Sequence, residues 1–251
     1  MATTVSGSTG AFANVSLKRV LIFCGILSSL LYTAANIVVP MQYEGYNAFS
    51  QTVSELSAIE APTRSLWVGF AGVYSLLVAA FGWGIWMSAG EKRSIRVVGI
   101  CILISAVVGL FWPPMHQREV LSDGGGSLTD TLHIAFAFFT VLMMLLAMLF
   151  GAASLGNRFR LYSIVSVLIM LVTGVLTGIA APSMEADLPT PWMGVWERIS
   201  IAAYMLWVIV LASLLLIRDR APESNAPRPL VTDDYLKAPV PHKGKMPARN
   251  F

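Results

Sequence analysis

The sequence predicts an all-α membrane protein, a polytopic bundle of six transmembrane helices with both termini in the cytoplasm. Of its 251 residues, 56% are hydrophobic and only 12% are charged, about half the charged share of a typical soluble domain. The apolar residues fall into six runs of 19 to 24 residues, and about 20 residues suffice for a helix to cross a bilayer. The runs lack the alternation of barrel strands. Composition therefore excludes an ordinary soluble protein.

Each run has boundaries typical of a transmembrane helix. The first, third and fifth runs finish at proline, at Pro40, Pro113-Pro114 and Pro182, and proline is common where a helix must stop. A polar loop then leads into the next run, and short basic turns join the second to the third and the fourth to the fifth. In chain order, the predicted helices are 20–39, 66–88, 97–115, 132–155, 161–181 and 199–217.

The distribution of Lys and Arg predicts the orientation. Loops 40–65, 116–131 and 182–198 hold three of the 17 basic residues and nine of the 14 acidic ones. The positive-inside rule therefore places these loops outside a bacterial inner membrane and both termini in the cytoplasm. The net charge of +3 hides this asymmetry, which is about +9 on the predicted inner side and about −6 on the outer side. The basic balance therefore reflects topology and permits attraction to anionic lipid, so membrane lipid is an expected partner and nucleic acid is not.

Composition divides the chain into three parts. Residues 1–16 are mostly Ser, Thr, Gly and Ala, and residues 218–251 carry six of the 13 prolines among charged residues. Neither segment has enough apolar surface to order itself. We expect a disordered N-terminal arm over 1–16, a transmembrane domain over 17–217, and a disordered, Pro-rich, basic cytoplasmic tail over 218–251.

Polar side chains that could carry chemistry gather in the outer loops. His133 is the only histidine, acid or base within the six apolar runs, so no charged transport route through the membrane centre is predicted. Any site is expected at the extracytoplasmic surface. No haem, nucleotide or iron–sulfur signature is present in the sequence, and the cofactor is left undetermined.

Two histidines mark the strongest candidate chemistry. His116 follows the third predicted helix and His133 opens the fourth, so both imidazoles are expected at one membrane depth. Asp130 lies one helical turn before His133 and could orient it for general-base work. Alternatively, His116 and His133 are the only plausible histidine ligands of a metal site completed by Glu55 or Glu119. A third interpretation has Ser127, Thr129 or Asp130 capping the helix and His133 as an interfacial residue.

The stretch 50–57 predicts a short amphipathic helix on the outer surface. Ser50 or Ser54 could act as a nucleophile if a histidine reached it, or both hydroxyls could satisfy loop backbone. Arg118 and Arg198 suit an anionic head group, or they pair with their acidic chain neighbours Glu119 and Glu197. The predicted catalytic residues are Ser54, Glu55, His116, Asp130 and His133, and the predicted substrate-binding residues are Asn47, Ser50, Arg118, Glu197 and Arg198.

Gly174 and Gly178 form a GxxxG pair in the fifth predicted helix. Small residues at this spacing allow helices to approach closely. We expect the pair to pack inside the bundle rather than to form a dimer face, and the oligomeric state is left open.

Several short motifs resemble the bacterial membrane proteins of the domain of unknown function 998 family. They are the segment 46–58 (YNAFSQTVSELSA), Ala61-Pro62, the segment 109–113 (GLFWP) and His133. The resemblance spans roughly residues 18–217 and implies a six-helix bundle with a polar outer face, without an established activity. One departure is the sequence from Trp112 to Arg118, where the family would have Phe-Pro followed by an acidic residue, so the resemblance assigns no role to His116.

These observations leave three classes of function. The first is a protein that binds or processes a lipid or small amphiphile at its outer face. The second is a non-catalytic structural, sensory or assembly subunit. A transporter is the third, and it is disfavoured because no charged residue lies at the centre of a predicted span.

Overall fold

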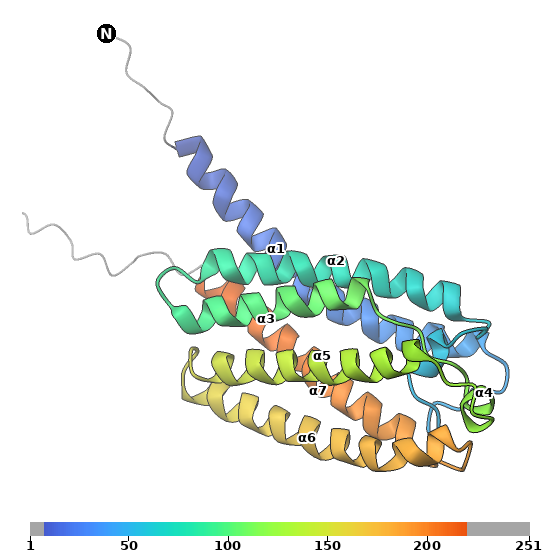
Figure 1. The fold of residues 1–251 in the computed structure, drawn as a ribbon. Coiled ribbons are helices and arrows are strands. Elements are labelled where there is room, and N and C mark those ends of the chain that lie inside the picture. The colour runs from blue at the N-terminus through green and yellow to red at the C-terminus, as the bar shows by residue number, and fades with distance from the viewer. Residues whose placement is uncertain (1–7, 220–251) are drawn as a thin grey trace, which may run out of the picture. The chain divides into compact units, whose positions relative to one another are not determined.

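The computed structural model describes residues 8–219, with side chains from residue 17 (Figure 1). No strand is present over this range. The helices are α1 (Ser8–Val38), α2 (Arg64–Ser88), α3 (Arg93–Leu110), α4 (Arg118–Ser122), α5 (Leu128–Ala152), α6 (Asn157–Glu185) and α7 (Met193–Arg218), with short 3₁₀ helices η1 (Pro40–Gln42) and η2 (Ser54–Ser57). Six of them, all but α4, are long and apolar enough to cross a membrane. The predicted all-α, polytopic membrane fold is confirmed.

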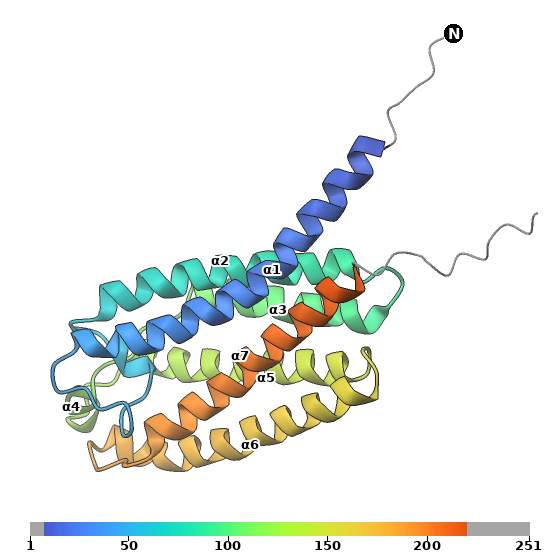
Figure 2. The same cartoon turned by 180° about the vertical axis from the view of Figure 1, so that it is seen from behind.

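The six long helices pack as a closed ring in chain order. Each contacts the next, from α1 through α2, α3, α5 and α6 to α7, and α7 closes the ring against α1. Figures 1 and 2 show the long helices running back and forth, with α4, η2 and the α6–α7 loop at one end. The α2–α3 and α5–α6 turns lie at the other end. All outer loops predicted from the sequence therefore meet at one end of the bundle.

The ring encloses a continuous apolar core. Ile22, Phe81, Ile102, Trp207 and Leu211 are at most 1% exposed and come from four helices. The indole N–H of Trp207 donates to Ser163 Oγ on α6 at 2.9 Å. The only polar atom of the Trp207 side chain therefore has a hydrogen-bond partner in the core. This packing holds α7 and α6 together in the half of the bundle opposite the predicted outer loops.

Glycine allows close helix packing at two places on α2, and neither place is the predicted pair Gly174 and Gly178. A Cβ on Gly82 would lie 3.0 Å from the Leu103 backbone nitrogen of α3, and one on Gly84 would lie 2.9 Å from the Ile22 nitrogen of α1. These two glycines let α2 pack closely against both neighbours. Gly174 and Gly178, in contrast, are exposed and would meet nothing within 4 Å. The packing partners of α6 lie on its other face.

Several helix ends differ from the sequence prediction. The α3 helix ends at Leu110, because Pro113 disfavours helical backbone at Trp112, the residue before it. The predicted end of the fifth span at Pro182 is wrong, since α6 continues through it to Glu185. A proline so close to the helix end leaves only a single backbone hydrogen bond unmade. The α1 helix begins at Ser8, so residues 8–16 are not the disordered arm that composition indicated. Helix extension beyond the bilayer costs little once a long helix has formed.

Ion pairs connect the end of α7 to α1. Asp219 caps α7 and pairs with Lys18 and Arg19, with Arg19 Nε 3.0 Å from Asp219 Oδ2. Arg19 Nη2 also donates to the Asp219 carbonyl at 2.9 Å. Arg218 and Asp219 thus belong to the folded domain rather than to the predicted tail, whose other residues, 220–251, lie outside the described range.

We expect Asp219→Asn to lower stability by about 1 kcal/mol at neutral pH. Burial alone would raise the pKa of Asp219, but the hydrogen bonds and charges of Lys18 and Arg19 lower it overall. A lowered folded-state pKa means that the pair stabilises the protein above the ordinary carboxyl pKa and that this contribution is lost as the pH falls through the folded-state pKa. Thermal unfolding in detergent, followed from neutral pH downwards, should show wild type and variant converging as the pH falls below the ordinary carboxyl pKa of about 4. A constant difference across this range would contradict the prediction, and Glu91→Gln at the same end is the control.

Candidate functional site

Ser54 and His133 meet at the end of the bundle where the predicted outer loops lie. Ser54 is the first residue of η2, and His133 lies in the second turn of α5. His133 Nε2 is 3.1 Å from Ser54 Oγ, and His133 as a whole residue is only 6% exposed. The other ring nitrogen, Nδ1, lies 2.8 Å from the Pro113 carbonyl oxygen. The imidazole is therefore held between a hydroxyl and a backbone carbonyl.

These contacts decide the tautomer that we assign to His133. A carbonyl oxygen only accepts, so the 2.8 Å contact requires a proton on Nδ1. Nε2 is then unprotonated and accepts a hydrogen bond from the Ser54 hydroxyl. The Trp112 indole Nε1 is 3.1 Å from Nδ1, and the two rings meet edge to face at 5.3 Å. In the opposite tautomer, Nδ1 would accept a hydrogen bond from Trp112 Nε1, but its lone pair would face the Pro113 carbonyl oxygen. The contact with Pro113 is the shorter of the two, 2.8 Å against 3.1 Å, so we place the proton on Nδ1.

The predicted pairing of Asp130 with His133 is wrong. Asp130 Oδ2 lies 2.8 Å from His116 Nδ1, and Asp130 Oδ1 accepts the His116 backbone N–H at 2.7 Å. Asp130 also completes a capping box with Ser127, the N-cap of α5. The alternative that Ser127 and Asp130 cap this helix is confirmed. The carboxylate turns towards the unpaired N–H groups of the first turn and away from the next turn of the helix.

Glu55 and Arg118 form a buried ion pair. Arg118 Nε donates to Glu55 Oε1 at 2.6 Å and Arg118 Nη2 to Glu55 Oε2 at 3.0 Å, with side-chain exposures of 11% and 5%. The remaining Arg118 donors reach Thr190 Oγ1 at 2.8 Å and the Ser50 carbonyl at 3.0 Å. The alternative pairing of Arg118 with Glu119 is wrong, because the Arg118 nitrogens donate to Glu55, Thr190 and Ser50. Arg118 instead joins three segments from the predicted outer loops, 40–63, 111–127 and 186–192. We call these three segments the outer cap.

Glu197 and Arg198 bind the outer cap and not each other. Glu197 Oε2 accepts the Val53 backbone N–H at 2.5 Å. Arg198 donates to the Ala48 carbonyl at 2.8 Å and to the Tyr46 hydroxyl at 2.6 Å. The suggested pairing of the two chain neighbours is therefore wrong, since adjacent residues on a helix point in different directions.

Tyr46, Asn47 and Ser50 complete this arrangement. Burial raises the pKa of Tyr46 to about 12 despite the nearby Arg198, so its hydroxyl stays protonated and donates to the Thr52 carbonyl at 2.7 Å. Asn47 Oδ1 accepts the Phe49 N–H at 2.9 Å, and the Ser50 carbonyl accepts from Arg118 and Thr190. All five residues predicted to bind substrate make hydrogen bonds that shape the outer cap.

The candidate metal ligands do not converge. His116 binds Asp130, His133 binds Ser54, and Glu55 binds Arg118. Within residues 17–219, no group of three or more His, Cys, Asp or Glu side chains is placed to hold a metal ion.

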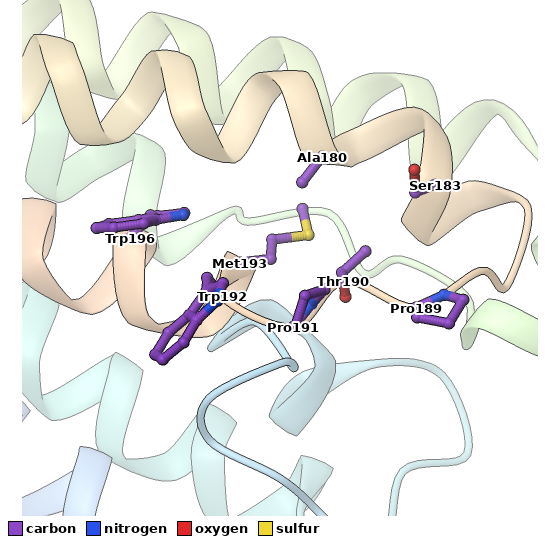
Figure 3. A pocket seen from close by; sticks show the side chains of 8 residues that line it. All are labelled: Ala180, Ser183, Pro189, Thr190, Pro191, Trp192, Met193 and Trp196. Atoms are coloured by element: carbon purple, nitrogen blue, oxygen red, sulfur yellow. The ribbon is translucent and has the colours of Figure 1, made fainter.

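Two pockets lie at this end of the described chain, and neither contains Ser54 or His133. Figure 3 shows the larger, of about 180 Å³, between the end of α6 and the start of α7. The smaller, of about 30 Å³, has room for about one or two waters. The larger is lined by Ala180, Ser183, Pro189, Thr190, Pro191, Trp192, Met193 and Trp196, and the smaller by Tyr43, Gln51, Glu55, Gln117, Arg118 and Glu119.

Sequence reasoning missed three residues of this region. The Pro113 carbonyl and the Trp112 indole surround His133, and Thr190 bonds Arg118. The only sequence signal near the first two is the GLFWP segment (109–113), which predicts a helix end. Nothing in the sequence distinguishes Thr190 from other loop threonines.

A family model described as protein of unknown function (DUF998) matches residues 26–214. This range contains every predicted site residue. No curated protein and no solved structure matches the chain.

Proposed function

Because the chain belongs to the DUF998 family of proteins of unknown function, its activity has to be inferred from its own residues, and we propose that its outer face binds and processes a lipid or small amphiphile. Ser54 is the proposed nucleophile and His133 the general base. The contact of 3.1 Å between Ser54 Oγ and His133 Nε2 carries this proposal. It is the pairing of hydroxyl and base that nucleophilic catalysis requires.

The proposed reaction is acyl transfer from an ester. Ser54 Oγ attacks the ester carbonyl while its proton moves to His133 Nε2. The imidazolium then donates that proton to the leaving alkoxide oxygen as the ester bond breaks. A water molecule, deprotonated by the same nitrogen, releases the acyl group from Ser54. The Pro113 carbonyl, 2.8 Å from Nδ1, holds the ring and stabilises the imidazolium, in the place that a carboxylate takes in a catalytic triad.

An amphiphilic substrate suits the surroundings of this pair. Phe111, which precedes Trp112, is 73% exposed, and Leu132, which precedes His133, is 39% exposed. These side chains belong to the ends of α3 and α5, where the bundle faces lipid. A substrate with an acyl chain could therefore reach the pair from the membrane, with its polar part at the outer cap.

A fluorophosphonate probe tests the proposal in membranes. We expect covalent labelling of the wild type, none at this position in Ser54→Ala, and labelling slowed by about 100-fold or more in His133→Gln. Ser122→Ala, which removes an exposed hydroxyl at the same end, is the matched control and should label as the wild type does. Mass spectrometry of the labelled peptide identifies the modified serine.

Two results would contradict the proposal. One is a wild type that reacts no faster than Ser54→Ala. The other is an His133→Gln protein that loses abundance while its remaining folded fraction labels normally, because His133 would then be a packing residue.

A second candidate function is a non-catalytic structural, sensory or assembly subunit. It is favoured by the outer cap, where Arg118, Glu55, Arg198 and Glu197 are all engaged with other parts of the same chain. Such a cap would present a fixed surface to a partner. Absence of labelling together with a partner that copurifies after crosslinking would support this candidate.

A further inference from the structure

Six exposed basic side chains gather at the end of the bundle opposite the outer cap. They lie at the start of α3, at the start of α6 and at the end of α7, and Figures 1 and 2 show these helix ends at one end of the bundle. We call this surface the basic end. Its members are Lys92, Arg93, Arg96, Arg158, Arg160 and Arg218, all of them exposed.

Two hydrogen bonds make the basic end one continuous surface. Ser154 Oγ in the α5–α6 turn donates to Ser94 Oγ at the start of α3, at 2.7 Å. Arg218 Nη2 donates to the Leu155 carbonyl at 3.2 Å, which brings the end of α7 to the same turn. Cations that are more than 100 positions apart in the chain therefore lie around a single junction.

The charge of this surface is not neutralised within the described residues. None of the six cations takes part in an ion pair there, and Asp219, the nearest acid on α7, is held by Lys18 and Arg19. Arg96 and Arg218 donate only to backbone carbonyls. No acidic residue lies in the first turn of α3 or α6, where cations add to the positive end of the helix dipole. Binding of an external anion would reduce the electrostatic repulsion among these six cations.

Stacked indoles mark the level of the membrane surface beside the basic end. Trp83 and Trp86 lie in the last two turns of α2, their ring centroids 4.8 Å apart, and they are 48% and 40% exposed. Exposed Trp side chains on transmembrane helices concentrate in the lipid head-group layer. The guanidinium groups that follow on α3 are therefore at phosphate depth.

We propose that the basic end binds the head groups of anionic phospholipids in the adjacent leaflet. Arg93 and Arg158, which come from the two neighbouring turns, can each take a phosphate through a two-pronged guanidinium contact. This binding is independent of the Ser54–His133 site.

Lipid titration of the detergent-purified protein, read by native mass spectrometry, tests the proposal. We expect the wild type to retain phosphatidylglycerol at least about tenfold more tightly than phosphatidylcholine. Arg93→Gln/Arg158→Gln should weaken phosphatidylglycerol binding by about tenfold or more. Arg93→Lys/Arg158→Lys keeps the charges but loses the two-pronged contact, so it should weaken binding less than the Gln/Gln variant does. Glu91→Gln removes the exposed acid beside Lys92 and should strengthen binding. Raising the salt from about 0.1 M to about 1 M should weaken it by screening.

Three outcomes would overturn the proposal. Equal retention of the two lipids would show that charge does not select them. Unchanged phosphatidylglycerol binding by the Gln/Gln variant would place the lipid elsewhere. If millimolar inorganic phosphate displaced all of the phosphatidylglycerol, the basic end would be a site for a free anion rather than for a lipid head group. Because binding is measured in detergent, any effect of the substitutions on membrane orientation does not enter the result.

Discussion

Arg118→Met is expected to destabilise the protein by about 3–5 kcal/mol. The substitution leaves the Glu55 carboxylate, which is 5% exposed, without its cation. Thr190 Oγ1 and the Ser50 carbonyl lose their shared donor as well. Because Arg118 joins three chain segments, the outer cap should loosen as a unit. Thermal or denaturant unfolding of the purified protein measures the loss.

Two further variants separate the ion pair from a general effect of removing charge. Glu119→Gln changes the exposed neighbour and should shift stability by less than about 0.5 kcal/mol. The double variant Glu55→Gln/Arg118→Met removes the stranded charge and should recover part of the loss. If Arg118→Met were as mild as Glu119→Gln, the buried pair would not hold the outer cap together.

Gly194→Ala is the second substitution with a large expected effect. Gly194 lies in the first turn of α7, directly against the segment 48–51. An added Cβ would clash with the backbone carbonyl oxygens of Gln51 and Ala48, and Arg198 Nη1 would be 2.9 Å away. Backbone cannot rotate aside as a side chain can, so α7 and the outer cap must separate. We expect a loss of about 3 kcal/mol, at the upper end for an overpacked site.

Gly174→Ala is the matched control for this steric argument. Gly174 is also on a transmembrane helix, but a Cβ there would meet nothing within 4 Å. Since alanine favours helix more than glycine does, this variant should be neutral or slightly stabilising. Equal melting temperatures for Gly194→Ala and Gly174→Ala would refute the close approach of α7 to the outer cap.

The number and type of the spanning elements could be predicted because lipid allows few solutions. A chain in hydrocarbon has to satisfy its backbone internally, so an apolar run of about 20 residues becomes a helix almost regardless of its neighbours. Six of the helices match the six apolar runs. Helix ends were less predictable, as Pro182 shows, because one missing hydrogen bond near an end is tolerated.

The partners of the polar residues could not be predicted in the same way. Sequence reasoning pairs residues that are close in the chain, and so it assigned Asp130 to His133 and suggested Glu119 for Arg118. The structure pairs Asp130 with His116, 14 positions away, and Arg118 with Glu55, 63 positions away. Buried charges and hydroxyls select whichever complementary group the packed helices bring within reach.

The sequence by itself determined that this protein is a six-span helical membrane protein of the DUF998 family with its polar residues gathered in alternate loops. Local composition and the thickness of the bilayer are sufficient for that result. Only the tertiary structure decided that Ser54 meets His133, across 79 positions of chain. It also decided that the basic side chains of three helix ends form one surface. Both depend on the closed order of the helices in the ring, which arises from side-chain packing between distant segments rather than from any local pattern.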